Sequence, residues 1–407
     1  MSTTLLPYLL CLLPRLSLVL WMGWGDGQPI VFLYETRTMP FWDPLPVLVH
    51  DFASSLPFSR PLILGVGYTL VASFLGPLVY RLGILLDLPH RSAMLAVVGV
   101  SAYPYYVSTG WYQPEGGVTI MLTALCALGF ARVARNPSVP ATLFCSVAAC
   151  LLLLERADSV LFIGFMGGLA YVSLGRRNRS RKPLLYLGVV VLAAVFCTAS
   201  INYFAFGRYS ALPAKGGYNL LLGHNADVNR YLREDHSTTL ELAVLDTAFG
   251  PFPPEIMADL QNPAHSDRFT QRAFAFMREH PGLTLVNTWH KFRRYWDWRL
   301  EDAEAQSSLK NLTYAVPYLS LMAFAAVGTV FLLLKRGHYP LAFMLGGVLA
   351  SSIPGLVTIP IIRIRMYSEF LLVLLAAVAI GVLVTEIRER TATHRLHSRQ
   401  TPKLPAQ

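Results

Sequence analysis

Charge is scarce in this chain. Only 14% of its 407 residues are Asp, Glu, Lys or Arg, and 54% are hydrophobic; soluble globular proteins carry about a quarter charged residues. None of the five cysteines falls in the long polar segment 207–311, so that segment has neither a disulfide framework nor a metal-type cysteine spacing. No P-loop, GxSxG, HExxH or dinucleotide fingerprint occurs. These absences argue against the soluble enzymes that carry such motifs.

Long apolar stretches take up about half of the sequence. A helix needs about 20 apolar residues to cross a bilayer. About ten such stretches lie at 4–24, 61–86, 92–109, 117–134, 140–154, 158–175, 184–206, 312–334, 339–362 and 367–385. The sequence therefore predicts an all-α, polytopic membrane protein of about ten transmembrane helices. Segment 140–175 can be read as two short spans or as one broken hairpin.

Basic residues follow every second apolar stretch. They are His90-Arg91, Arg132 with Arg135, the run 176–182, Lys335-Arg336 and the tail from Arg388. Positively charged loops remain in the cytoplasm. This predicts a multi-pass protein of the inner (plasma) membrane with both termini inside and 207–311 outside. The net charge of +10 is then explained by these loops, so membrane lipids, and no nucleic acid, are the expected partners.

The pattern divides the chain into four parts. Residues 1–206 form a transmembrane module with a first outer loop from about 25 to 60; 207–311 form an outer, helical loop region; 312–387 hold the last transmembrane helices; and 388–407 form a basic cytoplasmic tail, predicted to be disordered. Within the outer region an amphipathic helix is expected from about Asp267 to Trp298. Pro281 and Gly282 should break that helix.

Polar residues at the outer boundary are the candidates for chemistry. Asp26 follows the first stretch, and a carboxylate there suits a general base that deprotonates a hydroxyl. Its alternative is a turn residue between two glycines. Glu115 follows Pro114 at the outer end of a hairpin, where it either holds a substrate hydroxyl or is an acid at a helix N-terminus.

Two further charged groups lie at the same boundary. Glu155-Arg156-Ala157-Asp158 separates two short apolar stretches, and charges at membrane depth are costly and often functional. An internal Glu–Arg–Asp network is the structural alternative.

Arg363 and Arg365 oppose the positive-inside trend. Their paired N–H donors suit a phosphate, and the alternative is an arginine that snorkels at a helix end.

Five stretches occur in a consistent order along residues 4–385. They are Asp26 in the first outer loop, Tyr103-Pro104 followed by Gln113-Pro114-Glu115, the stretch 153–158, Gly216-Gly217-Tyr218-Asn219-Leu220 with Lys291 and Trp296 later in the same region, and Arg363-Ile364-Arg365-Met366. In this order the chain resembles the polytopic GT-C glycosyltransferases, which take sugar from a polyprenyl-phosphate carrier. Bacterial protein mannosyltransferases and aminoarabinose-to-lipid A transferases belong to that group.

The resemblance implies an inverting, single-displacement transfer to an extracytoplasmic acceptor: a lipid, a glycan or a protein. Asp26 would be the base, with Glu35, Asp43 and Asp51 as rivals. Substrate contacts would come from Glu115, Arg156, Asp158, Tyr218, Asn219, Lys291, Arg363 and Arg365. Arginines can stabilise a monophosphate leaving group, so no metal and no other cofactor is expected.

Two other functions stay open at this point. A transporter or flippase of lipid-linked sugars would show internal repeats with paired broken helices, and the sequence shows none. A non-catalytic membrane subunit would use the outer region only for docking. Such a subunit would not need an arginine pair beside apolar helices.

Overall fold

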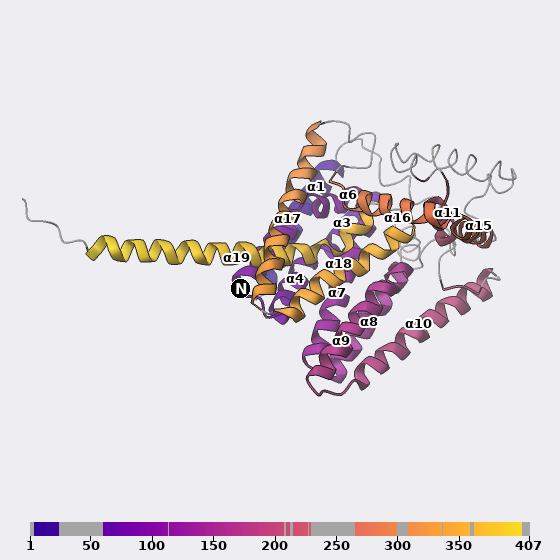
Figure 1. Cartoon of the computed structure of the whole chain (residues 1–407), viewed down its shortest axis with the longest axis horizontal. Helices are drawn as coiled ribbons and strands as arrows, with labels where there is room; N and C mark the ends of the chain where they lie inside the picture. The colour runs from indigo at the N-terminus through magenta and orange to yellow at the C-terminus, as the bar shows by residue number, and fades with distance from the viewer. Residues whose placement is uncertain are drawn as a thin grey trace, which may run out of the picture.

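The protein is a helical bundle (Figure 1). The computed structural model describes residues 4–23, 60–112, 114–206, 209–211, 215–226, 228, 265–298, 308–335, 337–358 and 362–400. These residues are 89% helical and include no strand, which confirms the all-α prediction for the described part of the chain. The helices are α1 (Leu5–Gly23), α3 (Arg60–Ala72), α4 (Leu75–Leu85), α5 (His90–Ala102), α6 (Pro104–Tyr112), α7 (Pro114–Arg135), α8 (Val139–Glu155), η1 (Ala157–Ser159), α9 (Val160–Arg176), α10 (Lys182–Phe206), α11 (Lys215–Gly223), α15 (Ser266–Glu279), α16 (Pro281–Tyr295), α17 (Ser308–Leu334), α18 (His338–Val357) and α19 (Ile362–Gln400).

Seven helical segments of the described chain are long and apolar enough to cross a membrane. They are Gly65–Leu85, Gly116–Arg135, Ala157–Arg176, Lys182–Ser200, Asn311–Leu334, His338–Val357 and Arg365–Thr391. Two shorter apolar helices cover Leu5–Leu20 and Val139–Glu155. The chain is thus a multi-pass membrane protein by the length and composition of its helices, while the count of ten spans stays a prediction.

The helix breaks inside the expected span 92–109, and also between the two short stretches predicted at 140–154 and 158–175. The expected span 92–109 divides into α5 and α6 at Tyr103, which has extended backbone (φ −70°, ψ 117°). Pro104 has no N–H and disfavours helical geometry at the residue before it. Segment 140–175 is broken at Arg156, which also has extended backbone (φ −153°, ψ 108°).

The centre of the bundle is α19. It packs against α5, α7, α17 and α18, and side chains such as Phe370 and Leu374 are fully buried. Gly328 of α17 allows the closest of these approaches, because a methyl group there would overlap the carbonyl oxygen of Leu375. Small residues let transmembrane helices approach closely in this way.

The basic loops meet at one end of the bundle, here called the basic end. Arg135 pairs with Asp87 at 2.9 Å and donates to the carbonyl oxygen of Leu85 at 3.1 Å. Arg179 in turn donates to the carbonyl oxygen of Arg135. The ends of α4, α7 and α9 therefore lie together. Three of the loops that the sequence predicts on one side of the membrane thus share one end of the structure.

A group of amphipathic helices, α11, α15 and α16, lies away from that end and is here called the cap (Figure 1). α16 packs against α18, and α11 packs against α15. The predicted break in the outer amphipathic helix is confirmed: α15 ends before His280, and Pro281 begins α16.

The last helix, α19, continues to Gln400, beyond the expected span 367–385, and projects from the bundle in Figure 1. The disorder expected from residue 388 stays a prediction. Glu386 and Arg390 pair one helical turn apart at 3.0 Å, and such i,i+4 pairs support an exposed helix.

Candidate active site

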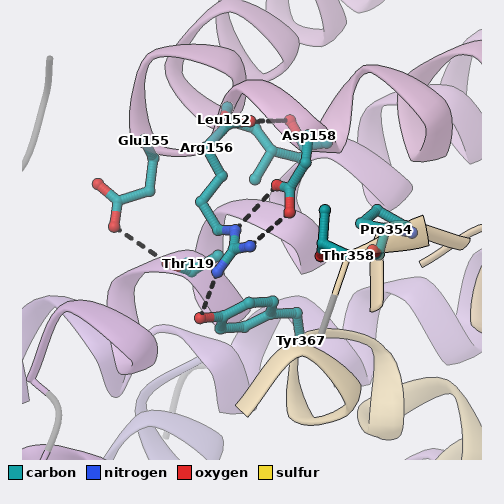
Figure 2. Close-up of polar contacts among 9 residues, drawn as sticks. Thr119, Leu152, Glu155, Arg156, Asp158, Pro354, Thr358 and Tyr367 are labelled. Atoms are coloured by element: carbon teal, nitrogen blue, oxygen red, sulfur yellow. Dashed lines mark hydrogen bonds and ion pairs between the residues drawn. The ribbon is translucent and has the colours of Figure 1, made fainter. Parts of the chain in front are cut away.

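A charged pair lies at the junction of α8 and α9. The break at Arg156 turns its side chain towards Asp158 of η1, and Nε donates to Oδ1 at 2.9 Å. Nη2 pairs with the second carboxylate oxygen. Nη1 donates to the hydroxyl of Tyr367 on α19 at 2.8 Å, and the guanidinium carbon lies 4.6 Å from the centre of that ring. Arg156 thus joins two segments that are far apart in sequence (Figure 2).

Glu155 takes a different direction from its neighbour. Its Oε1 accepts a hydrogen bond from the hydroxyl of Thr119 on α7 at 3.0 Å, as Figure 2 shows, and only 4% of the residue is exposed. Arg156 thus pairs with Asp158, and Glu155 is tied to α7 through Thr119.

A small cavity opens beside the charged pair. Its volume is about 30 Å³, room for about two water molecules. It is lined by Thr119, Thr123, Leu152, Arg156, Asp158, Ser159, Phe162, Ala350, Ser351, Pro354 and Tyr367. Charged and hydroxyl groups are thus gathered at one point among apolar helices, where leaving them unpaired would cost several kcal/mol.

Arg365 is enclosed by protein groups. It is 1% exposed and pairs with Glu369, itself 0% exposed, at 2.6 Å. Its Nη1 donates to the carbonyl oxygens of Tyr295 and Asp297 at 2.9 and 2.8 Å, and its guanidinium lies 3.9 Å from the ring centre of Tyr318. Nη2 is buried without a partner among the described residues. Arg365 therefore holds the end of α16 on α19, a structural role that its sequence position did not reveal.

The Gly-Gly-Tyr-Asn-Leu stretch builds the cap. Gly217 lies so close to the first turn of α15 that a methyl group there would overlap Ser266. Tyr218 is buried and meets Phe269 edge to face, with ring centres 5.9 Å apart. Asn225 donates to the carbonyl oxygens of Leu221 and Leu222 at 3.1 and 2.9 Å, satisfying the end of α11. The motif explains how α11 packs.

Lys291 of α16 is completely buried at the end of α18. Its amine lies 3.4 Å from the carbonyl oxygen of Val357 and 3.3 Å from that of Thr358. His224 Nε2 lies 2.7 Å from the Val357 oxygen and 3.3 Å from the amine. A carbonyl oxygen only accepts, so Nε2 carries the hydrogen and donates to Val357. The histidine therefore has a hydrogen on Nε2.

Burial shifts the protonation of both groups. It lowers the pKa of Lys291 from 10.5 to about 7. The pKa of His224 falls from 6.5 to about 4, first because the ring is desolvated and second because Lys291 is close, against a smaller opposing effect of the Val357 hydrogen bond. His224 Nδ1 is buried without a partner in the described part of the chain, so a proton there would have no acceptor.

The structure brings together only part of the predicted site. Arg156 and Asp158 meet at the cavity, whereas Tyr218 and Lys291 are packed in the cap, and Asn219 is half-buried on α11. Glu115 and Arg363 lie on α7 and α19, but their side chains are outside the described structure, as are Asp26, Glu35, Asp43 and Asp51 altogether. The substrate roles of these residues stay predictions.

Sequence reasoning missed Thr119, Tyr367 and the pair partner Glu369. Thr119 gave no signal, because a lone threonine in an apolar stretch is common. Glu369 did give a signal, because a carboxylate one helical turn after Arg365 has the spacing of an ion pair.

Within the described chain, no three His, Cys, Asp or Glu side chains come together as a metal site. Comparison with protein-family models and with curated proteins finds no match to this chain.

Proposed function

We propose that this chain is an integral-membrane glycosyltransferase that moves a sugar from a polyprenyl-phosphate carrier to an extracytoplasmic acceptor. One observation carries the proposal: a cavity lined by Arg156, Asp158 and Tyr367 lies among apolar helices, away from the basic end. Ionisable groups at such depth mark substrate sites more often than they serve packing. The sequence resemblance to GT-C transferases supplies the reaction class.

The cavity chemistry suits a sugar. Asp158 offers acceptors to hydroxyl groups, Arg156 offers donors, and the tyrosine ring gives an apolar face; such convergent polar groups in an apolar pocket fix a ligand's orientation. The cavity of about 30 Å³ is far smaller than the several hundred Å³ of typical ligand sites. A hexose therefore requires the surrounding helices to separate from the arrangement described here.

The remaining roles follow from the resemblance. Asp26 deprotonates the acceptor, and Arg363 with Arg365 stabilises the leaving phosphate. Arg365 can do so through Nη2, since its other donors are taken by Glu369 and two carbonyl groups. Inversion at the anomeric carbon then needs neither metal nor cofactor. The active site faces outward, because the basic loops keep the opposite end in the cytoplasm.

Deleting the gene tests this function in the cell. We expect mass analysis of envelope lipids and glycans to show one sugar-bearing product missing and a carrier-linked sugar accumulating. The wild-type gene restores the product. Arg156→Gln restores it at a rate lowered about 10- to 100-fold, because a bidentate charged contact contributes about 1.5–3 kcal/mol.

Arg268→Gln is the matched control, since Arg268 is exposed on α15 and loses the same charge far from the cavity. It should restore the product fully. A transporter would instead leave the carrier-linked sugar intact on the wrong side of the membrane. Unchanged lipids and glycans in the deletion strain would reject both functions.

A further inference from the structure

Polar side chains join the end of α11 and the helix α16 to the end of α18. Lys291 is 0% exposed and His224 is 5% exposed, and both reach the last carbonyl groups of α18. Gly223 allows this approach, because a methyl group there would overlap the carbonyl oxygen of Thr358. Three segments, distant in sequence, thus meet at one helix end.

That helix end is also a wall of the cavity. Pro354 and Ser351 of α18 line it, and Figure 2 shows Thr358 and Pro354 on the side of Asp158. The carbonyl groups at a helix C-terminus lack partners within the helix and accept hydrogen bonds from outside it. Any movement of α16 would therefore be passed to the residues that face Asp158.

We propose that Lys291 and His224 are positioning residues that latch the cap onto the end of α18 and so set the shape of the cavity. The effect of this latch on catalysis rests on the proposed function. The latch itself rests on geometry, because the amine of Lys291 and the imidazole of His224 contact the carbonyl groups of Val357 and Thr358 at the C-terminal end of α18. Releasing them frees the wall of the cavity that Pro354 forms.

The latch responds to pH with a defined sign. Lys291 and His224 both have pKa values that are lower in the docked state than in water, so the undocked state binds more protons and acid favours release. The contribution of Lys291 to docking of the cap is complete at high pH and is lost as the pH falls from 10.5 to about 7. The contribution of His224 is lost as the pH falls from 6.5 to about 4. No carboxylate of the described residues is among the causes of either shift, so none of those residues opposes this trend through an ion pair.

These shifts imply large changes in the ratio of docked to undocked cap. For Lys291 the ratio falls on the order of 50-fold from pH 9 to pH 7. For His224 it falls on the order of 20-fold more from pH 7 to pH 5. Acidification around the cap would thus loosen the cavity wall.

Distances between spin labels test the latch without any substrate. Labels go on cysteines replacing Leu285 of α16 and Ile353 of α18, which are 73% and 43% exposed, after serine replaces the accessible Cys150 and Cys197. In the full-length protein in lipid nanodiscs we expect one narrow distance at pH 9 and a growing second, longer distance down to pH 5.

Three variants separate the latch from general instability. Lys291→Met should show the longer distance already at pH 9, because the carbonyl groups lose their donor. His224→Asn keeps a donor for Val357 but cannot titrate, so the change between pH 7 and pH 5 should disappear. Arg293→Met, on the exposed face of α16, should match the wild type.

Wild-type distances that do not change from pH 9 to pH 5 would overturn the latch, even if Lys291→Met failed to fold. So would a Lys291→Met distribution identical to that of the wild type. In the transfer reaction the acid limb of the rate profile should move to lower pH in His224→Asn. A wild-type protein that transfers no sugar at any pH refutes the proposed function, while the distances still decide the latch.

Discussion

Replacing Arg365 by methionine is expected to lower the free energy of unfolding by about 3–5 kcal/mol, because it leaves the carboxylate of Glu369 buried without its partner. Both residues are less than 2% exposed, so water cannot take the place of the guanidinium. Denaturation by sodium dodecyl sulfate in mixed micelles, followed by the loss of helical circular dichroism, measures the change.

The double variant Arg365→Met/Glu369→Leu is the decisive control. Removing both charges of a buried pair is often neutral or stabilising, so it should recover most of the loss. The carbonyl groups of Tyr295 and Asp297 stay without that donor, which sets a residual cost of about 1–3 kcal/mol. If the single variant is as stable as the wild type, the ion pair does not organise the bundle. If the double variant is no more stable than the single variant, the loss of stability comes from the missing contacts to the carbonyl groups of Tyr295 and Asp297.

Replacing Asp26 by asparagine is expected to reduce the rate of transfer about 100- to 10,000-fold, the usual cost of removing a general base. The amide keeps the shape of the side chain but accepts no proton, so folding and carrier binding should persist. Initial rates with purified protein, at saturating carrier-linked sugar, give the effect on kcat.

Glu35→Gln, Asp43→Asn and Asp51→Asn are the matched controls, since each removes one carboxylate from the same outer loop. They should keep rates close to that of the wild type. A loss of transfer rate confined to one of these three variants would assign the role of general base to that residue. The proposed reaction itself would be unchanged. Activity in all four variants would mean that this loop performs no proton transfer.

Much of the helical framework could be predicted from composition and charge. The apolar stretches correspond to helices, and the breaks at Pro104 and Pro281 occur where proline removes a donor. The basic loops after α4, α7 and α9 gather at one end, as Arg135 and Arg179 show. These features depend on local sequence alone: hydrophobic length, proline geometry and the sign of nearby charge.

The contacts of the site could not be predicted in the same way. Arg156 and Tyr367 are 211 positions apart, and Lys291 and His224 are 67 apart, so only the packing of the helices brings each pair together. For Arg365 the sequence predicts a phosphate contact, whereas its bonds to Glu369 and to two backbone carbonyl groups arise only from the fold.

The most direct test of the account is to supply the purified, full-length protein in nanodiscs with polyprenyl-phosphate-linked sugars and a membrane extract from the deletion strain as acceptor. The account predicts release of free polyprenyl phosphate together with a new glycosidic bond of inverted configuration, both lost in Asp26→Asn and strongly reduced in Arg156→Gln. A carrier-linked sugar that remains intact throughout, while the extract is glycosylated by wild-type membranes, would contradict it.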